Sequence, residues 1–247
     1  MYALRARIKK EIITEFIPPE KKSNKVIILL SGMPTYPSNK EVMFFLASKG
    51  YFVFLPRYRG TWESDGSFLK KSPHLDVIDV IDSLSLGFKD LWSDKTYKIK
   101  NPEIYIIGSS FGGTAAILSS KDKRVKKIVA LSPVIDWRVK SKTEPIEWLG
   151  EFTKKAFGNA YRFTSKDWNK LKTGKFFNPI AEIKNLDKEK LYIIHAKDDD
   201  VVYSRPSEEF SKSLDSKFTL FKTGGHLSLS NLTVPSFWKP ISKFIEK

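Results

Sequence analysis

Three side chains suited to covalent catalysis occur far apart in the sequence, in the order Ser110, Asp199 and His226. A serine hydroxyl is a weak nucleophile until a neighbouring base takes its proton, and an imidazole can do so near neutral pH. A carboxylate that accepts a hydrogen bond from the other ring nitrogen holds the imidazole in one tautomer. The three residues therefore predict a nucleophile, an orienting acid and a base.

The predicted nucleophile lies in the motif Gly-x-Ser-x-Gly, which runs from Gly108 to Gly112. An apolar run precedes the motif and a helix-like segment follows it. A strand that turns sharply into a helix places the central serine on a strained elbow, and its small neighbours let the backbones approach closely. The motif alone is weak evidence, because short patterns of Gly and Ser arise by chance. Its context, with an Asp and a His downstream, makes it informative.

The predicted acid has competitors, because Asp198, Asp199 and Asp200 are consecutive. Only one of these carboxylates can point at the base, and the others are expected to be solvated or to cap the turn. We rank Asp199 first and Asp198 second.

His226 is the favoured base, because two glycines precede it and allow its loop to swing over the predicted sheet. His74 is expected to be an exposed surface residue, and His195 a packed structural imidazole at the end of a strand. Three separated histidines and the absence of cysteine leave no ligand cluster, so neither a metal nor a cofactor is expected.

The oxyanion of a tetrahedral intermediate needs hydrogen-bond donors. One donor is expected to be the backbone N–H of Phe111, directly after the nucleophile. The other is expected from the loop that follows the first central strand, and we assign it to the N–H of Met33.

Apolar runs alternate with helix-like segments along most of the chain, which predicts the α/β class with a doubly wound, mostly parallel sheet. The predicted buried strands cover residues 26–30, 51–55, 103–107, 127–131, 192–195 and 218–221. Residues 4–17 predict one or two edge strands, and 234–245 a helix. Ser38 and Glu41 have the spacing of a capping box at a helix start. In such sheets ligands bind at the carboxyl ends of the strands, where the three catalytic candidates follow strands.

Residues 136–185 break this alternation and are rich in aromatic residues. We expect one domain over residues 1–247, with 136–185 as a helical cap inserted in it. The aromatic rings either build the core of this cap or face an apolar substrate pocket. Trp137, Trp148 and Phe152 are the candidates for the pocket.

The chain has 247 residues, with 43 Lys and Arg against 28 Asp and Glu, for a formal net charge of +15. The lysines are scattered, and no zinc-finger, RNP or helix-turn-helix pattern is present. This favours a solvated basic surface over a specific nucleic-acid partner. No window approaches the ~18 apolar residues that span a membrane, and no signal-peptide core is visible. We expect a cytoplasmic protein; its oligomeric state is open.

Taken together, these motifs resemble those of the α/β-hydrolase superfamily, in its esterase and prolyl-oligopeptidase-like branch. Residues 195–202 resemble the segment H-G-x-x-D-x-V-V, whose alignment places the acid on Asp199, with Ala196 in place of the usual Gly. Residues 31–34 resemble the oxyanion loop H-G-x-P, with Ser31 where His is common. Residues 57–66 resemble Y-R-G-x-G-x-S-x-G, with Trp62 in place of a small residue.

The resemblance implies a serine hydrolase that works through an acyl-enzyme on a small ester or a short acyl-peptide. We favour esters, because peptidases of this branch usually carry an N-terminal β-propeller that screens substrates by size, and we expect no such domain within these 247 residues. A small single-domain peptidase of the acylaminoacyl- or dipeptidyl-peptidase type is the alternative, in which Glu144, Glu147 or Glu151 could hold a peptide amine. A non-catalytic binding protein of the same fold, or a polyanion-binding module, ranks lower.

Overall fold

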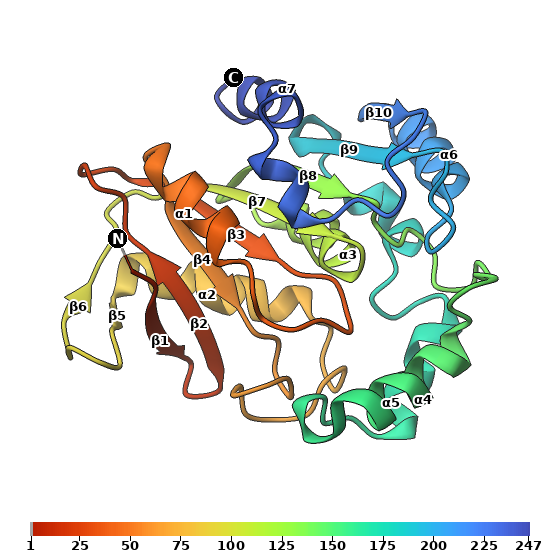
Figure 1. Ribbon diagram of the computed structural model, residues 1–247, viewed down its shortest axis with the longest axis horizontal. Coiled ribbons are helices and arrows are strands. Elements are labelled where there is room, and N and C mark those ends of the chain that lie inside the picture. The colour runs from red at the N-terminus through yellow and green to blue at the C-terminus, as the bar shows by residue number, and fades with distance from the viewer. Residues whose placement is uncertain (1) are drawn as a thin grey trace.

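A computed structural model describes residues 2–247, and its centre is an eight-stranded sheet between two layers of helices (Figure 1). The first three strands in sheet order pair antiparallel, and all the following pairs are parallel. In sheet order the strands are β1 (Leu4–Ile8), β2 (Ile12–Ile17), β4 (Phe52–Pro56), β3 (Lys25–Leu30), β7 (Glu103–Ser109), β8 (Val125–Leu131), β9 (Leu191–Ala196) and β10 (Lys217–Phe221). This confirms the predicted doubly wound, mostly parallel sheet.

The central strands are buried on both faces, which is why they read as continuous apolar runs. In β3, Ile27 and Leu29 belong to the apolar core on one face, beneath α1 (Lys40–Ser48) and α7 (Pro235–Ile245). Val26, Ile28 and Leu30 belong to the core on the other face, beneath α2 (His74–Leu86), α3 (Phe111–Leu118) and α6 (Ser204–Leu214). Helices on both faces leave the carboxyl edge of the sheet free for a site.

Shorter elements connect these layers. A two-stranded ribbon pairs β5 (Phe88–Lys89) with β6 (Thr96–Tyr97). Short 3₁₀ helices are η1 (Ser119–Lys121), η2 (Gly158–Ala160), η3 (Lys170–Thr173), η4 (Pro179–Asn185), η5 (Lys188–Lys190) and η6 (Leu229–Thr233).

The predicted capping box of Ser38 and Glu41 is wrong. Helix α1 begins at Lys40, so Asn39 is its N-cap and Ser38 lies one residue outside. Neither residue caps the helix through its side chain, and the amide of Asn39 donates instead to Ser31 Oγ at 3.0 Å. The spacing of Ser38 and Glu41 fits a capping box, but the helix begins one residue later than that box requires, and the side chain of its N-cap bonds to the preceding loop.

The expected exposure of His74 is also wrong. Its ring is partly buried and lies 2.8 Å from Ser72 Oγ through Nδ1. Burial disfavours the charged imidazolium and, with the nearby Lys121, lowers the pKa of His74 to about 4.

Residues 136–185 contain helices α4 (Ile146–Phe157) and α5 (Ser165–Asn169) with turns η2 to η4, and the two helices lie together at the lower edge of the molecule (Figure 1). Backbone hydrogen bonds join this segment to the loop after β4: the N–H of Arg162 donates to Gly60 O, and the N–H of Phe68 to Arg162 O, each at 2.7 Å. Tyr161 and Trp168 are buried in the core. The segment is therefore fixed to the sheet through the loop 57–72.

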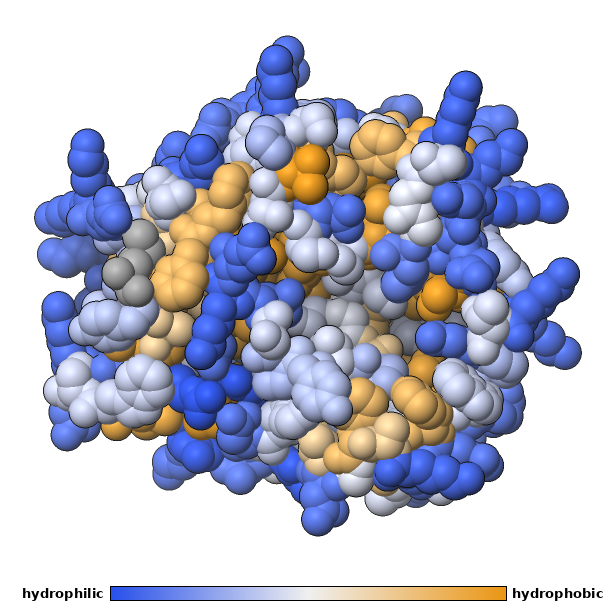
Figure 2. Space-filling view, in the orientation of Figure 1, coloured by the Kyte–Doolittle hydropathy of each residue, from blue (hydrophilic) through white to orange (hydrophobic). Residues whose placement is uncertain are grey.

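Hydrophilic residues cover most of the face in Figure 2, and apolar residues gather in several places, among them the lower edge, where Figure 1 places α4. No helix within residues 2–247 is long and apolar enough to cross a membrane.

Candidate active site

Ser110 occupies a strained turn between β7 and α3. Its φ of 54° and ψ of −122° lie in a region that non-glycine residues rarely adopt. A Cβ on Gly108 would lie 2.2 Å from Gly112 O, and one on Gly112 would lie 2.1 Å from Leu30 O. The motif thus needs its glycines because the elbow is pressed against its own helix and against β3.

The structure brings His226 and Asp199 together from the ends of neighbouring strands. His226 follows β10 and Asp199 follows β9, and the distance from His226 Nδ1 to Asp199 Oδ2 is 2.8 Å. A carboxylate only accepts, so Nδ1 carries the proton and Nε2 is free to act as a base. The arrangement is that of an orienting acid and an imidazole base.

Asp199 is buried, with every acceptor position of its carboxylate in use. Oδ1 accepts from the N–H groups of Val201 and Val202 at 3.1 and 2.9 Å, and Oδ2 accepts from His226 and from His195 Nε2 at 3.1 Å. Burial alone would raise the pKa of Asp199, but the hydrogen bonds from His195 and His226 outweigh it and hold this pKa well below its usual range. The acid therefore stays ionised.

His195 is fully buried and acts on Asp199 rather than on substrate. Its Nε2 lies 2.8 Å from Val202 O as well as 3.1 Å from Asp199, while its Nδ1 lies 3.0 Å from Ser207 Oγ. Both partners of Nε2 are acceptors, which places the proton on Nε2. Sequence reasoning missed this positioning contact, although the spacing of four residues between His195 and Asp199 was visible.

Asp198 has a different place from its neighbour. Its exposed carboxylate accepts from the N–H groups of Gly224 and Gly225 at 3.2 and 2.9 Å, directly before His226. These bonds lower the pKa of Asp198. Asp198 thus holds the backbone of the base-bearing loop, while Asp199 holds the imidazole.

Ser110 and His226 line the same cavity, which has a volume of about 480 Å³. Within residues 2–247 no hydrogen bond joins Ser110 Oγ to the His226 ring. The hydrogen bond between a nucleophile and its base is often long or absent until a substrate binds. What the structure shows is that the side chains of both residues reach the same cavity.

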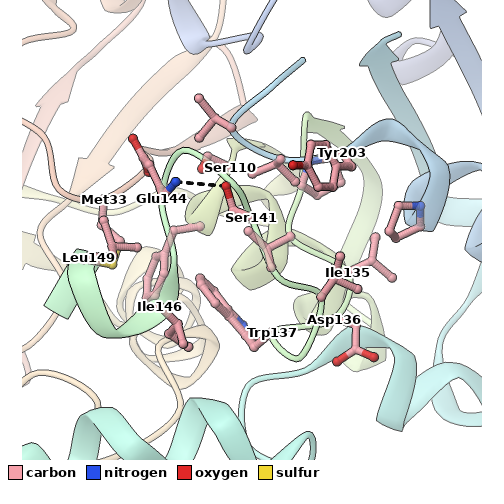
Figure 3. A pocket seen from close by; sticks show the side chains of 17 residues that line it. Met33, Ser110, Ile135, Asp136, Trp137, Ser141, Glu144, Ile146, Leu149 and Tyr203 are labelled. Atoms are coloured by element: carbon pink, nitrogen blue, oxygen red, sulfur yellow. Dashed lines mark hydrogen bonds between the residues drawn. The ribbon is translucent and has the colours of Figure 1, made fainter. Parts of the chain in front are cut away.

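A second, smaller cavity is also lined by Ser110. It has a volume of about 70 Å³ and is mostly apolar, with Met33, Trp137, Ile146 and Leu149 among its walls (Figure 3). Ser110 lines both cavities, and His226 lines only the larger one. The serine therefore lies at their junction.

The two predicted oxyanion donors lie beside the serine. A Cβ on Gly32 would be 3.1 Å from Ser110 Cβ, so the backbone before Met33 passes close to the nucleophile. Within residues 2–247 the N–H groups of Met33 and Phe111 donate to no protein acceptor. Two unused donors next to a nucleophile suit the charge of an oxyanion.

The three aromatic pocket candidates separate in the structure. Trp137 lines the smaller cavity and Phe152 lines the larger one. Trp148 lines neither, which corrects the expectation for this residue. It is 45% exposed and stacks on the ring of Phe152 at a centroid distance of 4.8 Å.

Of the three glutamates considered for an amine site, only Glu144 lines the cavities at Ser110. Glu147 pairs with Lys172 at 2.8 Å, and Glu151 is exposed and lines a separate hollow.

Within residues 2–247 no cluster of three or more acidic or histidine side chains is arranged to hold a metal ion.

Solved structures with a similar fold include an esterase from Pyrococcus furiosus, with a TM-score of 0.70 and 18% identity over 99% of this chain and 89% of the other. An acylaminoacyl peptidase from Pyrococcus horikoshii gives a TM-score of 0.66 and 20% identity over 99% of this chain and 41% of the other. A protein of Butyrivibrio proteoclasticus solved with ferulic acid gives 0.67 and 19% over 99% and 100%.

No curated protein matches the chain significantly. The sequence profile of the prolyl oligopeptidase family, in contrast, matches residues 37–235, which include the serine elbow, both aspartates and the histidine loop. This match covers most of the chain and agrees with the fold and with the resemblance of the motifs. The protein therefore belongs to the prolyl oligopeptidase family, within the α/β-hydrolase superfamily.

Proposed function

We propose that Ser110, His226 and Asp199 form the catalytic triad of a serine hydrolase that cleaves carboxylic ester or acyl bonds. The observation that carries this proposal is the 2.8 Å contact between His226 Nδ1 and Asp199 Oδ2, at a cavity that the strained Ser110 also lines. Similar structures of an esterase and of an acylaminoacyl peptidase support the class of reaction.

In this mechanism Ser110 Oγ attacks the acyl carbon while His226 Nε2 takes the hydroxyl proton. The oxyanion accepts from the N–H groups of Met33 and Phe111. His226 then gives its proton to the leaving group as the bond breaks, and an acyl-enzyme remains. A water molecule, activated in the same way by His226, releases the acid and restores the serine.

The two cavities suggest which part of the substrate each one holds. His226 must reach the leaving group, and it lines only the larger cavity, so the leaving group belongs there and the acyl group in the smaller apolar one. We favour esters over peptides, with a small serine peptidase as the alternative. A cytoplasmic location remains a prediction from the sequence.

The test is the intact mass of the protein after exposure to a fluorophosphonate. We expect one adduct on the wild type and none on Ser110→Ala or His226→Ala. Ser228 lines the same cavity and is exposed, so Ser228→Ala is the matched control and should still be labelled. A folded wild-type protein that takes no adduct would overturn the triad. A panel of esters and peptides then decides between the two substrate classes.

A further inference from the structure

The charge of the two cavities contrasts with the charge of the protein. The chain carries 43 Lys and Arg residues, yet among the described residues, 2–247, no Lys or Arg lines either cavity at Ser110. Two carboxylates line them, from Asp136 and Glu144. Asp136 is neutralised by Arg138 at 2.7 Å, whereas Glu144 has no such partner.

Glu144 lies just before α4, at the border between the cavities, since it lines both of them together with Ser110. Its backbone N–H donates to Ser141 Oγ at 3.0 Å, the bond drawn in Figure 3. Within residues 2–247 its carboxylate makes no hydrogen bond and no ion pair. The side chain is thus held at the site by its backbone but is unused within the protein.

The surroundings of Glu144 make its negative charge costly. Burial raises the pKa of this carboxyl, and the nearby Asp199 and Asp200 add to the effect, while His226 opposes it. A carboxylate that loses part of its hydration without gaining a donor is destabilised. A cation bound in the cavity would remove this cost.

The walls of the larger cavity also suit a cation. Tyr36, Phe152 and Phe157 line it, and the rings of Tyr36 and Phe157 lie 5.4 Å apart between centroids. The face of an aromatic ring attracts ammonium groups. An unpaired carboxylate and aromatic ring faces both attract an ammonium group, whereas the carboxylate repels a leaving group that is anionic.

We propose that Glu144 selects substrates whose leaving group carries a positive charge, such as a primary or quaternary ammonium. The cation would lie in the larger cavity, between Glu144 and the aromatic walls. This inference rests on the proposed function, because the leaving group is placed there by the need for a proton from His226.

The test compares two phosphonothioates that share one phosphonyl group. One releases thiocholine, and the other releases its neutral isostere, in which a carbon replaces the nitrogen. In each reaction Ser110 Oγ bonds to phosphorus, the P–S bond breaks and the thiol leaves with the proton that His226 took from the serine. Second-order inactivation rates are measured at low salt for wild type, Glu144→Gln and Glu147→Gln.

We expect the wild type to react about tenfold faster with the cationic agent. Glu144→Gln should bring the ratio of the two rates close to one, and Glu147→Gln should leave it unchanged, because Glu147 is paired with Lys172 away from the cavities. Equal rates on the wild type overturn the proposal. So does an equal slowing of both agents by Glu144→Gln, which would mean that the carboxylate acts through His226. A protein that is labelled by a fluorophosphonate but by neither phosphonothioate also overturns the proposal, whereas a folded protein labelled by none of the three agents overturns the triad itself.

Discussion

Replacing each of two adjacent aspartates by asparagine separates the role of the triad acid from that of a loop anchor. In Asp199→Asn the remaining oxygen stays with the N–H groups of Val201 and Val202, so the new NH₂ group faces His226. His226 Nδ1 must then accept a hydrogen bond, and the ring proton moves to Nε2. That nitrogen can no longer take the proton of Ser110.

The wrong tautomer lowers kcat by about 10⁴ in serine hydrolases with this geometry, or about 5 kcal/mol of transition-state stabilisation. Asp198 contacts only the backbone of Gly224 and Gly225, at the surface, and an asparagine oxygen can still accept from one of them. We expect Asp198→Asn to lower kcat by less than about tenfold.

The assay is the hydrolysis of an activated ester by both variants, with the fold checked by circular dichroism. The ratio of the two kcat losses is the decisive quantity. A loss below about tenfold for Asp199→Asn, or a larger loss for Asp198→Asn, would refute the assignment of Asp199 as the triad acid.

Three further predictions concern the elbow, acid stability and acyl size. Gly112→Ala places a Cβ 2.1 Å from Leu30 O, so we expect a loss of about 3 kcal/mol or more in urea unfolding; a neutral effect would contradict the elbow geometry. Burial lowers the pKa of His74 from its ordinary value of 6.5 to about 4 in the folded protein. The neutral ring is therefore fully compatible with folding above about pH 6.5, and the protein loses stability as the pH falls from there toward about 4, because the unfolded chain binds the proton more readily. His74→Gln should remove roughly 2–3 kcal/mol of the stability difference between about pH 7.5 and about pH 4.5, and an unchanged pH dependence would refute this. Leu149→Ala enlarges the smaller cavity, so the preferred acyl chain of p-nitrophenyl esters should lengthen by about two carbons; no change would place the acyl group elsewhere.

The sheet could be predicted from the sequence because its strands are buried on both faces. A run such as residues 104–107 then consists of apolar and aromatic residues, and Gly108 and Gly112 after it are required because a Cβ there would lie within 2.2 Å of the backbone. The order of Ser110, Asp199 and His226 follows from the order of the strands that carry them. These signals are local or topological, and a single sequence contains both.

The walls of the site could not be predicted in the same way. Trp148 and Phe152 are four residues apart on α4 and share one face, but only Phe152 reaches a cavity. The spacing of two residues shows that they lie on the same face of a helix, but it does not show which helical turn is next to a cavity. Glu144 looks equivalent to Glu147 in sequence, yet it precedes the helix, so the helical period does not describe it.

The base is carried by the least buried strand of the parallel sheet. β10 forms its outer edge and has no fully buried residue, whereas every residue of β9 is buried. Ser110, in contrast, follows a central strand. Edges of sheets open locally at a lower free energy than their centres. The nucleophile and the base therefore belong to regions of unequal local stability. We expect activity to be lost at a lower denaturant concentration than the one that unfolds the sheet, because the loop that carries His226 unfolds locally and reversibly first.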